Sequence, residues 1–379
     1  MPPRPRITPV RPHSTRTRPK KPIATAVYIS APLPRPVPQP RGALLHCGRF
    51  FATSAGNHMK VGVLQFFSWP GRRGELSEVY DRAIERVQIM DQNGYDAVWI
   101  AEHHFSTYSV CPSIHMMGTH FAAQTKNLRI GTGVSLAAFY NPLRLAEEVA
   151  LLDVLSGGRV NWGAGRGFDP KEFSAFGVDR EESYPRFREN VEIVLEAWRS
   201  EKLNYAGEYH TYEDVMVLPK PLQDPHPPVW MAASSPPAVE WAGSMGRMIM
   251  MDPHSSMEAI AEKQAMYLDA REAAGHGREL QDTPVARLLA IAPTAEAARE
   301  VAENGARWTT GSYAKGGPVG GKDPVQRYVD EVIMWGTPEA VADMILENAE
   351  AGHLNYLLCA PLSQQSFTLF NEEVLPRIM

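Results

Sequence analysis

A single (β/α)8 barrel, an α/β fold with eight parallel strands, is the fold class that this 379-residue sequence predicts. Eight short apolar runs alternate with segments of helical periodicity across residues 59–379. Polar residues stand directly after several of these runs, where the carboxyl ends of parallel strands form an active-site face. A doubly wound open sheet is the alternative, and the number of strands favours closure into a barrel.

In the first half of the expected barrel, each apolar run is followed by a helical segment. Between positions 75 and 93, apolar residues recur on one face, and Gly94 follows as a terminating glycine. Pro142 and Gly157 mark the two ends of a later helix. The expected order is strand Val61–Phe67, helix Glu75–Asn93, strand Ala97–Ala101, helix Ser113–Gln124, strand Leu128–Val134, helix Pro142–Leu155, strand Val160–Ala164 and helix Tyr184–Ser200.

Two segments interrupt the alternation in the second half. Residues 205–228 are polar and proline-rich and are expected to form an excursion that contains a hairpin. Residues 308–327 hold five glycines and two prolines, which predicts a lid-like insertion after strand seven, with Lys315 or Lys322 near the site mouth. The remaining expected elements are strand Val229–Ala232, helix Pro237–Met245, strand Arg247–Met251, helix Met257–Ala274, strand Ala286–Ile291, helix Ala295–Ala306, helix Pro338–Ala351 and strand Tyr356–Ala360.

Residues 1–58 differ from the rest of the chain. Twelve of the first 40 residues are proline, so this basic, Pro/Arg-rich extension is expected to be disordered. A targeting leader and a partner-binding arm are two interpretations. We favour a third, an extension upstream of a natural start at Met59, because Met59 directly precedes the first expected strand. The barrel domain is therefore predicted to span 59–379.

Charge and cysteine content narrow the class of protein. Ten of the 38 basic residues and none of the 43 acidic ones lie in 1–58, which leaves 28 against 43, or −15, in 59–379. An acidic body argues against nucleic-acid binding. Cys47, Cys111 and Cys359 have no paired spacing, which is typical of a cytoplasmic protein without a disulfide framework. No apolar run approaches the roughly 20 residues of a membrane span.

The run AVWIAEHHF, Ala97–Phe105, ends in polar side chains at the end of an expected strand. His103 and His104 point to opposite faces if strand geometry continues through them, so they cannot both bind one metal ion. Because no second ligand cluster is found, we predict no metal site. One imidazole is expected to face the barrel mouth and the other to pack sideways, and a structural hydrogen-bonded role is the alternative for either.

Two other strand ends carry candidate binding residues. In GAGRGF, Gly163–Phe168, small residues let a planar ring or a phosphate approach the backbone, and Arg166 offers a planar guanidinium. The segment lacks the GxGxxG spacing of dinucleotide sites, and a plain turn is its alternative. Ser234 and Ser235 precede an expected helix, where their hydroxyls either bind an anion or simply cap the helix.

Taken together and in this order, the motifs resemble the bacterial luciferase-like flavin-dependent monooxygenase family over nearly all of 59–379. The similarity rests on WIAEHHF, LRIGTGV, NPLRLAEEVALLDVLSGGRV, GAGRGF followed by KEFSAFGVD, and SSPPAVEWA. The resemblance implies a barrel that uses reduced FMN and O2 at the carboxyl ends of its strands. It also implies an NAD(P)H-dependent flavin reductase as a separate partner, and a homodimer.

The resemblance also implies roles for individual residues. His103 falls on the catalytic histidine, which would stabilise a flavin C4a-peroxide or act as an acid/base. A non-prolyl cis peptide falls on Gly133–Val134, beneath the isoalloxazine ring. The remaining expected cofactor-binding residues are Gly165, Arg166, Ser234 and Ser235.

Three positions depart from the pattern of the light-emitting subunit. Gly165 stands in place of its reactive cysteine, Tyr184 in place of its second phosphate-region arginine, and Ala238 in place of a hydroxyl-bearing residue. These departures argue against bioluminescence and against tight binding of the phosphate, and they leave monooxygenation as the expected activity.

The resulting hypothesis is a two-component FMN monooxygenase that oxidises a small apolar substrate such as an aldehyde or ketone. An F420-dependent reductase or dehydrogenase on the same fold and a non-catalytic flavin-binding partner subunit are the alternatives. A dry pocket is expected to protect the oxidising species. The aromatic residues expected to line it are Phe66, Phe67, Trp69, Phe139 and Tyr140.

Overall fold

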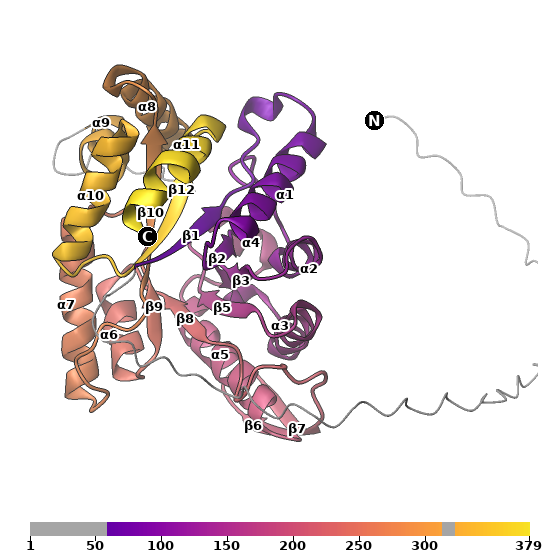
Figure 1. The fold of residues 1–379 in the computed structure, drawn as a ribbon. Helices are drawn as coiled ribbons and strands as arrows, with labels where there is room; N and C mark the ends of the chain where they lie inside the picture. The colour runs from indigo at the N-terminus through magenta and orange to yellow at the C-terminus, as the bar shows by residue number, and fades with distance from the viewer. Residues whose placement is uncertain (1–58, 313–322) are drawn as a thin grey trace, which may run out of the picture. The chain divides into compact units, whose positions relative to one another are not determined.

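A computed structural model describes residues 59–312 and 323–379 of the chain. The predicted extension 1–58 and residues 313–322 of the predicted lid, with Lys315 and Lys322, lie outside the described residues. The described chain folds around a curled parallel sheet with the strand order β11-β10-β12-β1-β2-β3-β5-β8-β9 (Figure 1). The eight predicted strands correspond to β1, β2, β3, β5, β8, β9, β10 and β12 of this sheet.

Backbone hydrogen bonds close the sheet into a ring. The amide of Met251, next to the end of β9, donates to the carbonyl of Pro284 in β10 at 2.8 Å, and the amide of Ala286 donates back to Met251 at 3.2 Å. Farther along β10, Leu289–Ile291 pair with β11 instead of β9. The predicted (β/α)8 barrel is therefore confirmed, with one additional strand at its carboxyl-end rim.

The elements follow the predicted order, and most of their bounds agree with the predicted ones within two residues. The strands are β1 Lys60–Gln65, β2 Ala97–Ile100, β3 Arg129–Thr132, β4 Ser135–Leu136, β5 Val160–Gly165, β6 Leu203–Ala206, β7 Thr211–Val215, β8 Val229–Ala232, β9 Met248–Met250, β10 Pro284–Ile291, β11 Met334–Gly336 and β12 Tyr356–Pro361. The α-helices are α1 Leu76–Gln92, α2 Ile114–Gln124, α3 Pro142–Ser156, α4 Pro170–Phe176, α5 Ser183–Arg199, α6 Pro236–Ser244, α7 Met257–Ala273, α8 Ala295–Ser312, α9 Pro324–Arg327, α10 Pro338–Glu350, α11 Gln364–Leu369 and α12 Leu375–Ile378. Short 3-10 helices cover Pro70–Arg72 and Ala137–Phe139, and π-helices cover Tyr328–Val332 and Phe370–Val374.

Two apolar layers hold the barrel together. The outer layer lies between strands and helices, and the inner one fills the barrel. In the inner layer, Trp99 lies edge-on to Trp230 at 5.2 Å between ring centroids and donates its indole N–H to the hydroxyl of Tyr356 at 3.1 Å. A Cβ on Gly131 would lie 2.4 Å from the Trp99 ring, so a glycine is required beside this tryptophan. These rings fill the barrel interior below the strand ends.

The two interruptions of the alternation have different outcomes. The predicted hairpin is present as the antiparallel pair β6 and β7. The predicted insertion after strand seven is shorter than expected, because α8 continues to Ser312 and α9 begins at Pro324. Thr309 is buried in the last turns of α8, so packing overrides the low helix propensity of this stretch.

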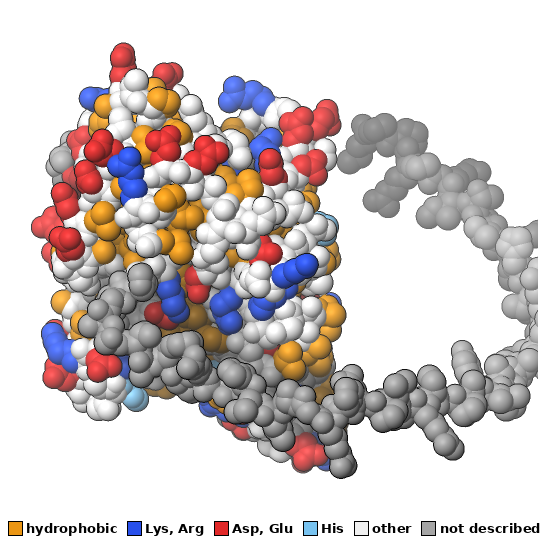
Figure 2. All heavy atoms as spheres, viewed as in Figure 1, with side chains coloured by type: hydrophobic (Ala, Val, Ile, Leu, Met, Phe, Trp, Pro, Cys, Tyr) orange, Lys and Arg blue, Asp and Glu red, His pale blue; other side chains and the backbone are white. Residues whose placement is uncertain are grey.

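Among the described residues, no helix has the length and apolar character of a membrane span. The viewed face carries scattered acidic side chains (Figure 2).

Candidate functional site

A pocket of about 470 Å³ opens at the carboxyl ends of the strands. Residues that follow β1, β2, β3, β5, β8 and β9 contribute to its wall. A volume of this size is within the range of small-molecule and cofactor sites. Six of the seven predicted site residues line the pocket, namely His103, Gly133, Val134, Gly165, Arg166 and Ser234. The seventh, Ser235, is not among the lining residues.

His103 and His104 lie in different surroundings, as predicted. The ring of His103 lines the pocket, stacks on Phe66 with 6.1 Å between centroids, and meets the edge of Tyr108 at 5.2 Å. The ring of His104 packs against Phe176, and its Nε2 lies 3.0 Å from Glu102 Oε1. One imidazole is therefore presented to the pocket, and the other helps to hold the loop. The described residues contain no cluster of three or more side chains suited to a metal ion.

A carboxylate that was not predicted stands beside His103. Glu172, in α4, is 2% exposed, and its Oε1 lies 3.9 Å from His103 Nδ1. The same oxygen accepts a hydrogen bond from the backbone amide of His104 at 3.0 Å. Glu172 therefore links α4 to the loop after β2 and places a negative charge next to the pocket imidazole. The sequence signal for Glu172 is its place in KEFSAFGVD, one of the segments that carry the resemblance.

The floor of the pocket is formed by the segment after β3. The Gly133–Val134 peptide is cis, as the resemblance implied. A Cβ on Gly165 would lie 2.4 Å from Val134 Cγ2, and one on Gly133 would lie 3.0 Å from Leu64 Cδ1. Val134 Cγ2 and Leu64 Cδ1 therefore pack directly against the two glycines, where a larger residue would clash.

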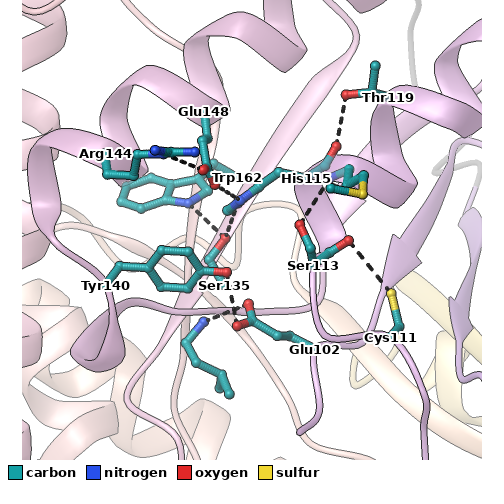
Figure 3. A network of polar contacts seen from close by, with 12 residues as sticks. Glu102, Cys111, Ser113, His115, Thr119, Ser135, Tyr140, Arg144, Glu148 and Trp162 are labelled. Atoms are coloured by element: carbon teal, nitrogen blue, oxygen red, sulfur yellow. Dashed lines mark hydrogen bonds and ion pairs between the residues drawn. The ribbon is translucent and has the colours of Figure 1, made fainter. Parts of the chain in front are cut away.

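A buried polar network fixes the chain immediately beyond this floor (Figure 3). Ser135 is fully buried, and its hydroxyl oxygen lies 3.1 Å from His115 Nε2 and 3.3 Å from Trp162 Nε1. The other nitrogen of His115 lies 3.1 Å from Glu148, which lowers the pKa of that carboxyl. Each of these polar groups is satisfied inside the protein, which favours a single backbone conformation next to the pocket.

Glu102 ties the end of β2 to the same segment. Its Oε2 accepts a hydrogen bond from the backbone amide of Leu136 at 3.2 Å, and its Oε1 accepts one from the hydroxyl of Tyr140 at 3.0 Å (Figure 3). Burial and this carboxylate raise the pKa of Tyr140 far above its usual value. Glu102, the acidic residue of the EHH motif, therefore has a structural role, while His103, which follows it, faces the pocket.

Guanidinium groups supply the positive charge of the pocket. Arg166 lies over the ring of Tyr184 at 4.3 Å from its centroid, and its Nη1 donates to the hydroxyl of Ser183 at 2.9 Å. Arg188 was not predicted, yet it lines the same pocket and lies over the Trp241 ring at 4.9 Å. Its Nε is buried and has no hydrogen-bond partner among the described residues.

The position of Arg188 follows from helix geometry. It lies four residues after Tyr184 in α5, so the two side chains share one face of the helix. Tyr184 takes the place of the second phosphate-region arginine, and Arg188 brings a guanidinium to the pocket one turn later. The spacing from Tyr184 was the sequence signal that could have revealed it.

The two serines before α6 have separate roles. Ser234 is exposed and lines the pocket. Ser235 is the N-cap residue of α6, but its side chain makes no capping hydrogen bond, and its hydroxyl lies 3.0 Å from the hydroxyl of Tyr184. The helix begins with Pro236 and Pro237, which lack N–H groups, so α6 offers few backbone donors to an anion.

The pocket wall after β9 carries a second histidine. His254 lines the pocket, and its Nδ1 lies 3.1 Å from the hydroxyl of Tyr328. Burial lowers the pKa of His254 to about 4, although the neighbouring Asp252 carboxylate acts in the opposite direction. His254 is therefore a neutral side chain near pH 7.

Most of the expected aromatic lining lies elsewhere. Phe66 lines the pocket, whereas Tyr140 is held by Glu102. Phe139 packs against Phe173 and Phe176 in α4. Of the other two, Phe67 is fully buried in the outer apolar layer, and Trp69 packs against that layer. The error arose because adjacent residues after a strand point to opposite sides of the sheet.

These features fit a flavin mononucleotide. Gly133 and Gly165 have no side chain and lie with Val134 in the pocket wall, which suits the close approach of a planar ring. Arg166 and the partly unsatisfied Arg188 suit a phosphate, because guanidinium groups bind phosphate oxygens strongly. The pocket therefore has the donor set and the shape for a flat ring that carries an anionic tail.

Similarity to known proteins identifies the family of the chain. The model of the luciferase-like monooxygenase family matches residues 59–354. The chain belongs to the luciferase-like monooxygenase family. Within this family, the chain is 30% identical over 299 residues to the uncharacterised protein y4wF of Sinorhizobium fredii, covering 75% of this chain and 85% of that protein. It is 33% identical over 178 residues to the oxygenase component of flavin-dependent trigonelline monooxygenase of Acinetobacter baylyi, covering 46% and 49% of the two chains.

Solved structures share the fold of this family member. The crystal structure of monooxygenase RslO1 from Streptomyces bottropensis matches with a TM-score of 0.75 and 28% identity, covering 85% of this chain and all of that one. F420-dependent relatives also occur, among them F420-dependent glucose-6-phosphate dehydrogenase of Amycolatopsis mediterranei, 26% identical and covering 78% of this chain and 93% of that protein. Membership in the family therefore indicates an oxidoreductase. It does not distinguish FMN from F420 as the cofactor.

Proposed function

We propose that this protein is the oxygenase component of a two-component FMN monooxygenase. It would take reduced FMN from a separate NAD(P)H-dependent reductase and insert one oxygen atom from O2 into a small organic substrate such as an aldehyde or ketone. The observation that carries the proposal is the placement of His103 in the same pocket as the Gly133–Val134 surface and the two guanidinium groups. Reduced FMN and O2 would supply the oxidising chemistry.

Different side chains of the pocket would bind the phosphate, support the ring and transfer a proton. Arg166 and Arg188 would hold the phosphate, and the surface formed by Gly133, Val134 and Gly165 would support the ring. Glu172 lies beside Nδ1 of His103, so Nε2 is the nitrogen that we expect to exchange a proton with the reacting group. The Phe66 and Tyr108 rings next to this imidazole would help to exclude water.

An F420-dependent reductase is the second candidate, because relatives that use F420 match the chain. Two observations favour FMN. A trigonelline monooxygenase component is among the relatives with the higher identity. Arg166 and Arg188 both line the pocket and provide charge for a terminal phosphate. We also propose a homodimer that acts in the cytoplasm, which agrees with the free and buried Cys111 and Cys359.

Flavin reoxidation tests the proposal. Photoreduced FMN is mixed with air, with and without the protein, and flavin absorbance and hydrogen peroxide release are recorded. We expect the protein to delay the return of oxidised FMN, and an aldehyde or ketone that is a substrate to lower the peroxide yield. Unchanged reoxidation, together with anaerobic turnover of reduced F420, would refute the FMN monooxygenase in favour of the second candidate.

A further inference from the structure

A second and larger cavity adjoins the flavin pocket. It has a volume of about 920 Å³ and lies between α1, α8 and the ends of β1 and β12. Leu64 and Phe66 line both cavities. Tyr108 also lines the second cavity, and its ring contacts both Phe66 and His103. A ligand in the second cavity would therefore reach the rings that surround the pocket imidazole.

The charge of this cavity is opposite to that of the protein. Its described lining contains four arginines, Arg73, Arg82, Arg86 and Arg307, and no aspartate or glutamate. The chain as a whole has a net charge of −5. Guanidinium groups gathered in a concave surface of an acidic protein raise the local concentration of anions.

Two of the four arginines have a carboxylate partner outside the lining. Arg307 Nη2 lies 2.8 Å from Glu303, and Arg82 Nη1 lies 3.8 Å from Glu78. These pairs are exposed, and exposed ion pairs are weak and exchange partners readily. They add to the positive potential of the rim without defining a ligand position.

Arg86 differs from the others because it is fixed and lacks a carboxylate. Its Nε donates to the side-chain oxygen of Gln364 at 2.9 Å, and its guanidinium carbon lies 5.2 Å from the centroid of the Phe367 ring. Among the described residues, no carboxylate lies within ion-pair distance of Arg86, and its two Nη atoms make no hydrogen bond. A fixed guanidinium with its Nη edge available matches the two oxygens of a carboxylate.

Two further polar atoms in the cavity wall are unsatisfied. Trp308 Nε1 and Gln65 Oε1 are buried and have no hydrogen-bond partner among the described residues, and Gln65 is 3% exposed. Buried polar groups without partners are uncommon, and a bound ligand is one way to satisfy them. The rest of the wall is largely apolar, with residues such as Leu288, Val301 and Leu362.

We propose that the second cavity binds an organic carboxylate with an apolar body, held at Arg86, and that such a molecule is the substrate of the monooxygenase. The statement that this molecule is a substrate rests on the proposed function. The carboxylate site itself is inferred independently, from the contacts of Arg86. The apolar body would extend along Leu64 and Phe66 toward His103. The proposal narrows the substrate class from neutral aldehydes and ketones to molecules that also carry an anionic group.

Binding of a matched pair of probes tests the site. The full-length protein, saturated with FMN, is titrated calorimetrically with 4-phenylbutanoate and with 4-phenylbutanamide, which differ in charge but hardly in shape. We expect the carboxylate to bind about 10-fold or more tightly than the amide, because a charge-assisted bidentate pair is lost with the amide. The preference should shrink to about 3-fold or less in Arg86→Met and persist in part in Arg86→Lys.

Arg278→Met is the matched control, because Arg278 is an exposed arginine outside both cavities and pairs with Asp269 and Glu272. Equal binding of the two probes to the unmodified protein would overturn the proposal, whether or not any variant folds. A carboxylate preference that survives Arg86→Met and disappears in Arg188→Met would also overturn it, by placing the anion in the flavin pocket.

The same titrations separate this inference from the proposed function. A carboxylate preference that depends on Arg86, in a protein that leaves reoxidation of reduced FMN unchanged, would support the site and refute the monooxygenase. Delayed reoxidation with no preference between the two probes would support the monooxygenase and refute the carboxylate site.

Discussion

Two groups of side chains in the pocket at the carboxyl ends of the strands are held in place by different means. The imidazole group, His103 with Phe66, Tyr108 and Glu172, is packed into the protein, and Tyr108 and Glu172 are 3% and 2% exposed. The guanidinium group, Arg166 with Tyr184 and Arg188, is only partly buried and relies on ring stacking. In the proposed function, the packed imidazole group would transfer a proton in a fixed geometry, and the partly buried guanidinium group would adjust to a phosphate. Substitutions in and next to the two groups test this difference.

The largest effect is expected at His103. His103→Ala should lower FMN-dependent substrate oxidation by about 10²- to 10⁴-fold, the range for loss of a general acid or base, and leave the dissociation constant of FMN within about 3-fold. Steady-state product formation and fluorescence titration of FMN measure the two quantities. The exposed His120 provides the control variant His120→Ala. A His103→Ala protein with normal turnover would refute the catalytic role.

The half-buried His254 should make stability depend on pH. Burial lowers the pKa of His254 to about 4 in the folded protein, from 6.5 as the ordinary value, so between these pH values only the unfolded chain binds the proton. The free energy of unfolding should therefore fall by about 3 kcal/mol from this residue as the pH decreases from 6.5 to 4.

Urea titrations of the unmodified protein and of His254→Gln, at several pH values in this window, measure the dependence. The variant should show a smaller decrease, and His120→Gln should behave like the unmodified protein. If the decrease is identical in all three proteins, then burial of His254 does not contribute to it.

Loss of a guanidinium from the second group should weaken binding of FMN but not of riboflavin, which has no phosphate. Arg188→Met should raise the dissociation constant of FMN by about 10- to 100-fold, because a charge-assisted contact to phosphate is removed, and leave riboflavin binding unchanged. Arg186→Met is a control in the same helix, outside the lining of the pocket. Equal weakening of FMN and riboflavin would mean that Arg188 supports the fold and does not bind the phosphate.

The smallest effects compare two regions next to these groups, the buried network around Ser135 and the contact of Ser235 with Tyr184. Ser135→Ala should lower the free energy of unfolding by about 1–3 kcal/mol, because His115 Nε2 and Trp162 Nε1 lose a buried partner. Ser235→Ala removes only a contact to Tyr184 and should cost less than about 0.5 kcal/mol. Chemical unfolding measures both variants. Similar costs for the two serines would remove the contrast between the regions.

Much of the fold could be predicted from the sequence because buried strands leave a strong local signal. The eight barrel strands have short apolar runs, and His103 comes directly after one of them. The elements that were missed lack such a signal. β11 has only three residues, and α4 has seven. Both take their conformation from packing against parts of the chain that are distant in sequence.

The site residues that were predicted differ from the missed ones in the same way: their positions follow from local sequence signals, and those of the missed residues do not. Gly133, Gly165 and Arg166 lie at or next to strand ends, so their neighbourhood follows from the barrel itself. Glu172 and Arg188 lie on helices after β5, and their relation to the pocket depends on the path of a connection that periodicity does not describe. Contacts across long sequence separations, such as that between Glu172 and the amide of His104, require coordinates.

The close approach of residue 165 to Val134 has a consequence for the evolution of this pocket. Because a Cβ at 165 would come within 2.4 Å of a Val134 methyl carbon, the two positions share one fixed volume in the wall of the pocket. A homologue with a bulkier residue at the first position should carry a smaller one at the second, so paired substitution across descendants of a common ancestor becomes the expected pattern.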